Sequence, residues 1–127
     1  MKILIVSQYF WPEEFRVNDL AIDLVKRGHE VTVLTGNPNY PKGKFTKGYG
    51  FKRSTENYKN ITIHRVPIIP RGNNSLMLIL NYLSFVISGS FFSFFYKKKI
   101  DKVFAVNFSP ITAVIPAIVY CKRKKQK

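Results

Sequence analysis

The first 36 residues carry the hydrophobic pattern of a β-α-β unit. Lys2–Val6 and Glu30–Thr35 are short apolar runs of the kind that form buried parallel strands. Between them, apolar residues recur at helical spacing and mark one face of a helix: Val17, Leu20, Ala21, Leu24 and Val25. Pro12 suits the first position of that helix, because its missing N–H would be unpaired there, and Gly28 supplies a left-handed stop.

Two further strands are predicted downstream. Ile61–Val66 and Lys102–Val106 have the composition of strands, and with the first two runs they would pair in the order third, second, first, fourth. Ser109 is expected to cap a helix over Ile111–Tyr120, with a bend at Pro116. This succession predicts an α/β fold with a Rossmann-like, mainly parallel sheet.

The turn after the first predicted strand lies at the carboxyl end of the sheet, where open parallel sheets bind their ligands. Residues 8–11 carry large side chains where a dinucleotide fingerprint needs glycine for close approach to a pyrophosphate. A sugar or a lipid head group fits better, because this region offers a flat ring, amide groups and a guanidinium fork. These groups belong to Gln8, Tyr9, Arg16 and Asn18. Phe10 and Trp11 either join them or fill the top of the core.

The loop after the second predicted strand reads GNPNYPKG, and its prolines and glycines force a rigid, non-helical path. With this loop, the chain resembles the N-terminal half of the GT-B glycosyltransferases of the family-4-like group. The likeness is greatest to bacterial enzymes of capsule, O-antigen and colanic-acid synthesis related to the fucosamine transferase. It rests on MKILIVSQYFWPEEFRVNDLA at the start, RGHEVTVLTG at 27–36, PNYP at 38–41 followed by Gly43, and NFSP at 107–110.

The resemblance implies that residues 1–127 form an incomplete, acceptor-side N-terminal domain of a GT-B fold, with the nucleotide-sugar-binding domain and the catalytic residues outside this chain. It also implies transfer of a sugar from a nucleotide-sugar donor, which the full-length relative would need, to a lipid-linked saccharide with retention of configuration. We therefore expect no glycosyl transfer by this chain alone. The side chains expected to bind the acceptor are Gln8, Tyr9, Glu13, Arg16, Asn18, Asn37, Asn39, Tyr40, Lys42, Asn107 and Ser109. The alternative is a truncated, non-catalytic module that binds a membrane or another partner.

The chain is strongly basic, with 21 Lys and Arg against 7 Asp and Glu and a formal net charge of +14. The excess is concentrated in residues 57–127, where twelve Lys and Arg stand against the single acid Asp101. Such a balance indicates an anionic partner, either nucleic acid or an anionic membrane leaflet.

Ser75–Tyr96 contains no charged residue and is followed at once by three lysines. It meets the length criterion for a transmembrane helix, but Asn81 and several serines dilute it and it lies inside a βα repeat. A core helix is the second alternative, although the phenylalanines occupy more faces than one buried stripe uses. We favour a helix that packs partly on the sheet and dips partly into the inner leaflet. The predicted membrane-binding residues are Phe91, Phe92, Phe94, Phe95, Lys97, Lys98 and Lys99.

The remaining features narrow the expected partners and location. Nucleic-acid binding is disfavoured, because the charges flank uninterrupted apolar surface instead of alternating with exposed aromatic residues. The lone Cys121 permits no internal disulfide, and the N-terminus reads as a core strand rather than a secretory leader. We therefore expect a peripheral protein on the cytoplasmic face of the inner membrane. No metal-ligand cluster is predicted, and His29 and His64 are interpreted as structural residues.

Overall fold

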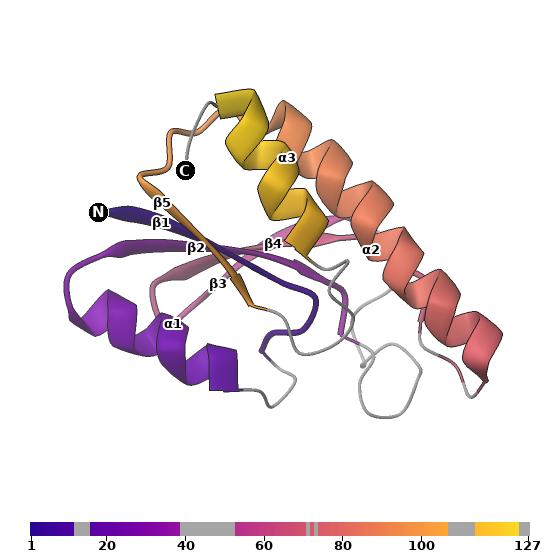
Figure 1. The fold of residues 1–127 in the computed structure, drawn as a ribbon. Coiled ribbons are helices and arrows are strands. Elements are labelled where there is room, and N and C mark those ends of the chain that lie inside the picture. The colour runs from indigo at the N-terminus through magenta and orange to yellow at the C-terminus, as the bar shows by residue number, and fades with distance from the viewer. Residues whose placement is uncertain (12–15, 39–52, 71, 73, 107–113, 125–127) are drawn as a thin grey trace.

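A computed structural model of the chain describes residues 1–11, 16–38, 53–70, 72, 74–106 and 114–124 (Figure 1). In this part of the chain the strands are β1 (Lys2–Ser7), β2 (Glu30–Gly36), β3 (Ser54–Tyr58), β4 (Ile61–Val66) and β5 (Lys102–Val106). The helices are α1 (Arg16–Lys26), α2 (Ser75–Phe95) and α3 (Ile115–Lys124). The four predicted strands are confirmed to within one residue at each end.

The strands form one sheet in the order β3-β4-β2-β1-β5. β1 pairs in parallel with β2 and β5, and β2 pairs in parallel with β4. This is the order predicted for the four parallel strands, and the α/β fold with a Rossmann-like, mainly parallel sheet is confirmed. Strand β3 is an addition to the prediction, and it pairs antiparallel with β4 at the edge of the sheet.

The sequence of β3 explains why its hydrophobic pattern did not predict a strand. Its five residues, STENY, are mostly polar and exposed, so they lack the apolar alternation of a half-buried strand. A two-residue turn joins β3 to β4, with φ of 49° at Lys59 and 66° at Asn60. Positive φ at both central residues is the geometry of a type I′ hairpin, but Lys-Asn lacks the glycine that usually marks this turn in a sequence.

Helices cover both faces of the sheet: α1 lies on one face, and α2 and α3 lie side by side on the other (Figure 1). The pleat of β1 directs Ile3 and Ile5 toward the α1 side, and Leu4 and Val6 toward the α2 and α3 side. Both faces of the central strands are therefore buried. This burial is why β1 and β2 read as continuous apolar runs.

The buried face of α1 is narrower than predicted. Val17 and Ala21 are buried, but Leu20 is 42% exposed. The helix presents the ridge formed by Val17, Ala21 and Leu24 to the sheet, and Leu20 lies at the margin of that ridge. The prediction that Leu20 faces the core is therefore wrong.

Helix α3 extends further along the chain than predicted. It begins at Ile115, so Pro116 lies in the first turn, where a missing N–H breaks no helical hydrogen bond and requires no bend. It continues past Tyr120 to Lys124, because cations are favourable near the negative end of a helix. The predicted end at Tyr120 is therefore wrong, and residues 107–113 lie outside the described part of the chain.

Helices α2 and α3 approach each other closely at Gly89. A Cβ added to Gly89 would lie 2.8 Å from Cγ of Pro116, which is closer than such atoms pack. The missing side chain therefore allows the contact, and it fixes which side of α2 faces α3. The N-terminus of α2 is capped by Asn74, whose side chain accepts a hydrogen bond of 2.9 Å from the backbone N–H of Met77.

Candidate functional site

The carboxyl ends of β1, β2, β4 and β5 lie at one edge of the sheet, because these strands are parallel. We call this the carboxyl edge, and the predicted acceptor-binding residues follow three of its four strands. Six of them lie outside the described residues: Glu13, Asn39, Tyr40, Lys42, Asn107 and Ser109. The other five differ in exposure: Gln8, Tyr9 and Asn37 are buried, Asn18 is half-buried and Arg16 is exposed.

The two rings that follow Tyr9 have different roles. Phe10 is completely buried and belongs to the core on the α1 side, so the alternative that it fills the top of the core is confirmed. Trp11 is half-buried and stacks on Tyr58 of β3, with ring centroids 4.1 Å apart. Trp11 therefore joins the first loop to the edge strand that the sequence pattern did not reveal.

Gln8 links the first loop to α2 through a buried polar pair. Its Nε2 donates a hydrogen bond of 2.6 Å to Oδ1 of Asn81, and Nδ2 of Asn81 donates one of 2.7 Å to the carbonyl of Ile69. Thr35 of β2 donates its hydroxyl to the carbonyl of Gln8 at 3.2 Å. Oε1 of Gln8 is buried and has no hydrogen-bond partner among the described residues, so the amide serves here to hold the first loop against α2.

Arg65 is a fully buried cation at the carboxyl edge that the sequence analysis missed. Its guanidinium donates to the carboxylate of Glu56, to the carbonyl of Trp11 and, at 3.2 Å, to the carbonyl of Gly36. It therefore ties together the loops after β1 and β2 and the edge strand β3. A signal was present: period-two alternation places Arg65 on the same face as the buried Ile61 and Ile63.

Helix α2 has its polar side chains on the inside and its apolar ones on the outside. Its buried residues are Asn81, Phe85, Gly89 and Ser93. Two half-buried serines also face inward: Ser84 accepts a hydrogen bond of 2.8 Å from the N–H of Ile69, and Ser88 donates one of 2.5 Å to the carbonyl of Pro67. Ser84, Ser88 and Ser93 thus point toward the protein and leave the outer side of the helix apolar.

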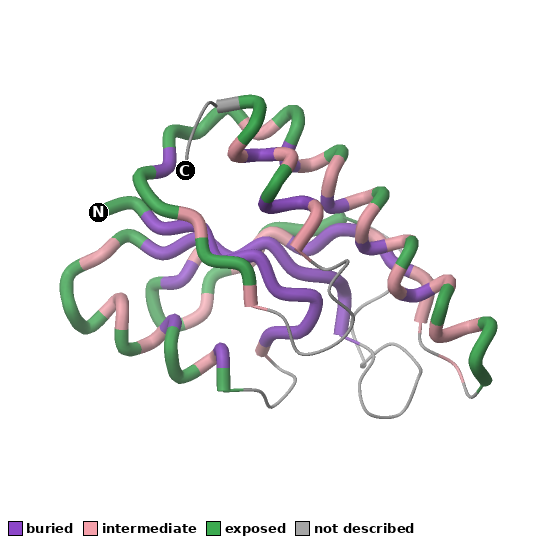
Figure 2. The backbone as a smooth tube through the Cα atoms, in the orientation of Figure 1, coloured by how far each residue is buried: buried purple, intermediate pink, exposed green. Residues whose placement is uncertain are grey.

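The outer side of α2 is a continuous apolar surface, which we call the α2 stripe. Exposed positions recur along the helix in Figure 2. The large apolar side chains among them are 49–65% exposed, and they are Leu76, Ile79, Leu83, Ile87, Phe91, Phe94 and Phe95. By length and composition α2 could cross a membrane, and within the described residues it is the helix that meets this criterion.

Cations gather where α2 ends. Lys97, Lys98 and Lys99 are exposed, and Lys98 forms an exposed ion pair with Glu30. Arg123 of α3 donates a hydrogen bond of 2.9 Å to the carbonyl of Tyr96, the residue after α2. The basic ends of α2 and α3 therefore lie together, next to the last phenylalanines of the stripe.

His64 of β4 lies beneath the last turn of α2. Its ring centroid is 5.0 Å from that of Phe92 and 5.4 Å from that of Tyr96, and its Nδ1 is 3.0 Å from the hydroxyl oxygen of Thr55. Burial lowers the pKa of His64 below its ordinary value of 6.5, and the nearby positive charges of Arg53 and Lys98 lower it further. The contacts agree with the structural role expected for this histidine.

Acidification is predicted to destabilise the fold through His64. Because the folded-state pKa of His64 lies below 6.5, the unfolded chain binds more protons in this range, and the free energy of unfolding falls as the pH drops from about 7.5 to 5.5. Glu30 does not interfere, since Lys98 lowers the pKa of its carboxyl below 4.5. Urea denaturation followed by the fluorescence of Trp11 measures the slope, and His64→Gln should flatten it. An unchanged slope in that variant would contradict the assignment.

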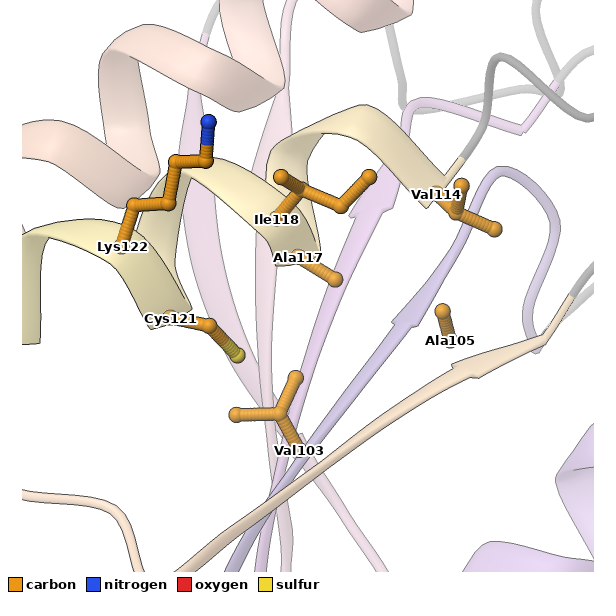
Figure 3. A pocket seen from close by; sticks show the side chains of 7 residues that line it. All are labelled: Val103, Ala105, Val114, Ala117, Ile118, Cys121 and Lys122. Atoms are coloured by element: carbon orange, nitrogen blue, oxygen red, sulfur yellow. The ribbon is translucent and has the colours of Figure 1, made fainter. Parts of the chain in front are cut away.

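A separate apolar pocket of about 380 Å³ lies between β5 and α3 (Figure 3). Val103 and Ala105 of the strand face Ala117 and Cys121 of the helix across it, while the ammonium group of Lys122 points away from the strand. Burial raises the pKa of the Cys121 thiol, which disfavours the reactive thiolate. The pocket therefore has no groups suited to catalysis. In the described part of the chain, no three His, Cys, Asp or Glu side chains come together as a metal site.

Comparison with known proteins gives one informative likeness. No family model matches the chain, and no solved structure matches it. The chain is 29% identical over 96 residues to a protein of Escherichia coli (strain K12) named "Putative colanic acid biosynthesis glycosyl transferase WcaI". The aligned region covers 72% of this chain and 24% of that relative, so the chain spans about a quarter of the relative's length. The likeness supports a distant glycosyltransferase relationship, and the mostly parallel α/β sheet is compatible with a partial Rossmann-like glycosyltransferase domain.

Proposed function

We propose that this chain forms the acceptor side of a GT-B glycosyltransferase of the family-4-like type. The enzyme would transfer a sugar from a nucleotide-sugar to a lipid-linked saccharide in bacterial surface polysaccharide synthesis, with retention of configuration. The distant likeness to a named glycosyl transferase supports the reaction class. The parallel sheet supports the location of the site, since ligands of such sheets bind at the carboxyl edge.

The α2 stripe is the observation that supports a lipid-linked acceptor. An exposed helix face in a water-soluble domain is normally polar, whereas here the polar side chains are turned inward. Fully burying one large apolar side chain is worth about 1.5–3 kcal/mol, so a leaflet that covers part of seven such side chains provides a large favourable free energy. Lys97 and Lys99 add attraction to anionic head groups of about 1 kcal/mol each.

We infer that α2 lies in the membrane surface and does not span the bilayer. Its inner side carries Asn81 and Ser93, which are buried in the folded chain, and Gly89, which packs against Pro116 of α3. A spanning orientation would separate this side from the sheet and expose the Asn81 amide to hydrocarbon. Burial of an unpaired amide in hydrocarbon is costly, which favours a peripheral protein on the cytoplasmic face of the inner membrane.

The acceptor saccharide would bind at the carboxyl edge near the start of α1. Arg16 is exposed and can form charge-assisted hydrogen bonds with a phosphate of the acceptor, while the buried Gln8 would hold the first loop in place beneath it. The other residues predicted for this site remain proposals that rest on the family resemblance. No step of catalysis is assigned to this chain, because the donor-side groups are proposed to lie in a separate domain.

Arg16→Ala tests the acceptor site. With farnesyl-diphosphate-linked N-acetylglucosamine as the probe, we expect binding to weaken by about 1.5 kcal/mol, roughly tenfold. This is the low end of the range for hydrogen bonds to charged groups, because Arg16 is exposed. Lys26→Ala is the matched control, since it removes a cation from the other end of α1 and should leave the affinity unchanged. Isothermal titration measures both variants.

The same experiment separates the proposal from its alternative. A non-catalytic membrane module would bind vesicles but would not recognise the saccharide part of the probe. Equal affinities of the wild-type chain for the probe and for farnesyl diphosphate alone would therefore favour the module. Equal losses of affinity in Arg16→Ala and Lys26→Ala would mean that only the net charge matters, and they would contradict the placement of Arg16 in the acceptor site.

A further inference from the structure

A second hollow, of about 370 Å³, lies between α2 and the carboxyl end of β4. Its walls are mostly apolar: Val66 and Pro67 line one side, and Ile87, Phe91 and Phe95 line the other, beside Ser88. Its volume falls within the range of about 300–1,000 Å³ that is typical of small-molecule sites. We call it the α2 groove.

One cation stands at the α2 groove, and it is free of any ion pair within the described residues. Arg53 lines the groove and is exposed. The register of β3 places Ser54 opposite Arg65, so Arg53 lies beyond it, at the carboxyl edge. A cavity with mostly apolar walls and one free guanidinium fits an amphipathic ligand that has a hydrocarbon part and an anionic group.

The contacts of α2 show how the groove is oriented. Asn81 contacts Gln8 at the carboxyl end of β1, Ser88 contacts Pro67 just after β4, and Phe92 lies against His64 within β4. Helix α2 therefore runs back from the carboxyl edge toward the amino edge of the sheet. Arg53 marks the end of the groove nearest the acceptor site, and Phe95 marks the opposite end.

The groove opens onto the surface that we propose to face the membrane. Ile87, Phe91 and Phe95 line the groove and are also members of the α2 stripe. A hydrocarbon chain could thus leave the leaflet and enter the groove without crossing water.

We propose that the α2 groove binds the hydrocarbon chain of the phosphorylated lipid that carries the acceptor, with Arg53 paired to its phosphate. This inference rests on the proposed function and extends it, because it assigns a place to the lipid part of the acceptor. The phosphate end at the carboxyl edge would present the attached saccharide to the first loop. The tail would extend along α2 toward Phe95.

Filling the groove tests this assignment without removing apolar surface. Farnesyl diphosphate is the probe, and equilibrium dialysis with the purified full chain measures its affinity. Ile87→Trp should weaken binding about tenfold or more by occupying the groove, while Leu20→Trp, at an exposed position on α1, should bind as the wild type does. Arg53→Glu should cause a similar loss, and Lys26→Glu makes the same charge change at the end of α1, outside the groove, and should have little effect.

The outcomes distinguish this inference from the membrane proposal. Wild-type affinity for farnesyl diphosphate in Ile87→Trp, or equal losses in the two tryptophan variants, would overturn the groove assignment while vesicle binding stood. If the chain had no affinity for vesicles, but Ile87→Trp alone lost affinity for farnesyl diphosphate, the groove assignment would be supported and the membrane proposal contradicted. Equal competition by dihexanoyl phosphatidylglycerol would overturn the lipid-carrier assignment in favour of a phospholipid.

Discussion

Replacing Arg65 with methionine is expected to lower the free energy of unfolding by about 3 kcal/mol. Methionine keeps a long apolar stem but removes the donors to Glu56, Trp11 and Gly36. Breaking a buried ion pair by removing one partner costs about 3–5 kcal/mol, and the low end applies because Glu56 keeps 29% of its side chain exposed. Urea denaturation followed by far-UV circular dichroism measures the loss.

Lys98→Met is the matched control for Arg65. It makes a comparable change in the ion pair with Glu30, whose partners are 43% and 49% exposed, and should cost much less than Arg65→Met. Arg65→Lys keeps the charge without the planar fork and should fall between the two, which preserves the test if Arg65→Met does not fold. A cost in Arg65→Met no greater than that in Lys98→Met would show that Arg65 does not hold the loops together.

The parallel part of the fold could be predicted because each central strand is buried on both faces. Such strands are continuous apolar runs, and glycine and charged residues mark their ends, so strand order followed from the usual rules of α/β topology. Strand β3 could not be predicted in the same way. It is held by pairing with β4, by the turn at Lys59 and Asn60 and by Trp11 stacking on Tyr58, and these contacts leave no apolar period in the sequence.

The side of α2 that faces the protein could not be predicted from its amino-acid composition. The sequence predicted a long apolar helix from Ser75, and the presence of Asn81 and several serines argued against contact with lipid. In the structure these polar side chains are buried or bonded to the loop at Pro67 and Ile69. The polar side of a long apolar helix normally faces water, so only the tertiary contacts reveal that the polar side of α2 faces the protein.

The location of the candidate site was predicted from the general rule that parallel sheets bind ligands at the carboxyl ends of their strands. The contacts within the site were not predicted. Parallel strands place their carboxyl ends together, which is why Gln8, Asn18 and Asn37 were expected near one another. The burial of Gln8 depends on Asn81, which is 73 residues away in sequence, and no local pattern reports such a pair. Arg65 is the clearest omission. The alternation of its strand indicates that it is buried, but nothing in the sequence indicates which groups accept its hydrogen bonds.

Removing apolar side chains from the α2 stripe is expected to reduce affinity for anionic vesicles by roughly 30-fold. Leu83→Ser/Phe94→Ser replaces two side chains that are 49% and 53% exposed in the folded chain. Burying the exposed part of each in the leaflet contributes about 1 kcal/mol to the binding free energy, and the variant loses both contributions. Leu20→Ser/Phe104→Ser is the matched control, with the same residue types at 42% and 47% exposure on α1 and β5. It should bind vesicles as the wild-type chain does, as measured by sedimentation.

Salt and carbonate washes then separate the modes of attachment. High salt should release the wild-type chain only partly, because screening weakens the contribution of Lys97 and Lys99 and leaves that of the apolar stripe. Complete release by salt would make the attraction purely electrostatic and would reopen the nucleic-acid alternative. Resistance to both salt and carbonate would favour a spanning helix. A monodisperse chain with no vesicle affinity would contradict the membrane proposal, because the exposed phenylalanines of α2 would then need no cover.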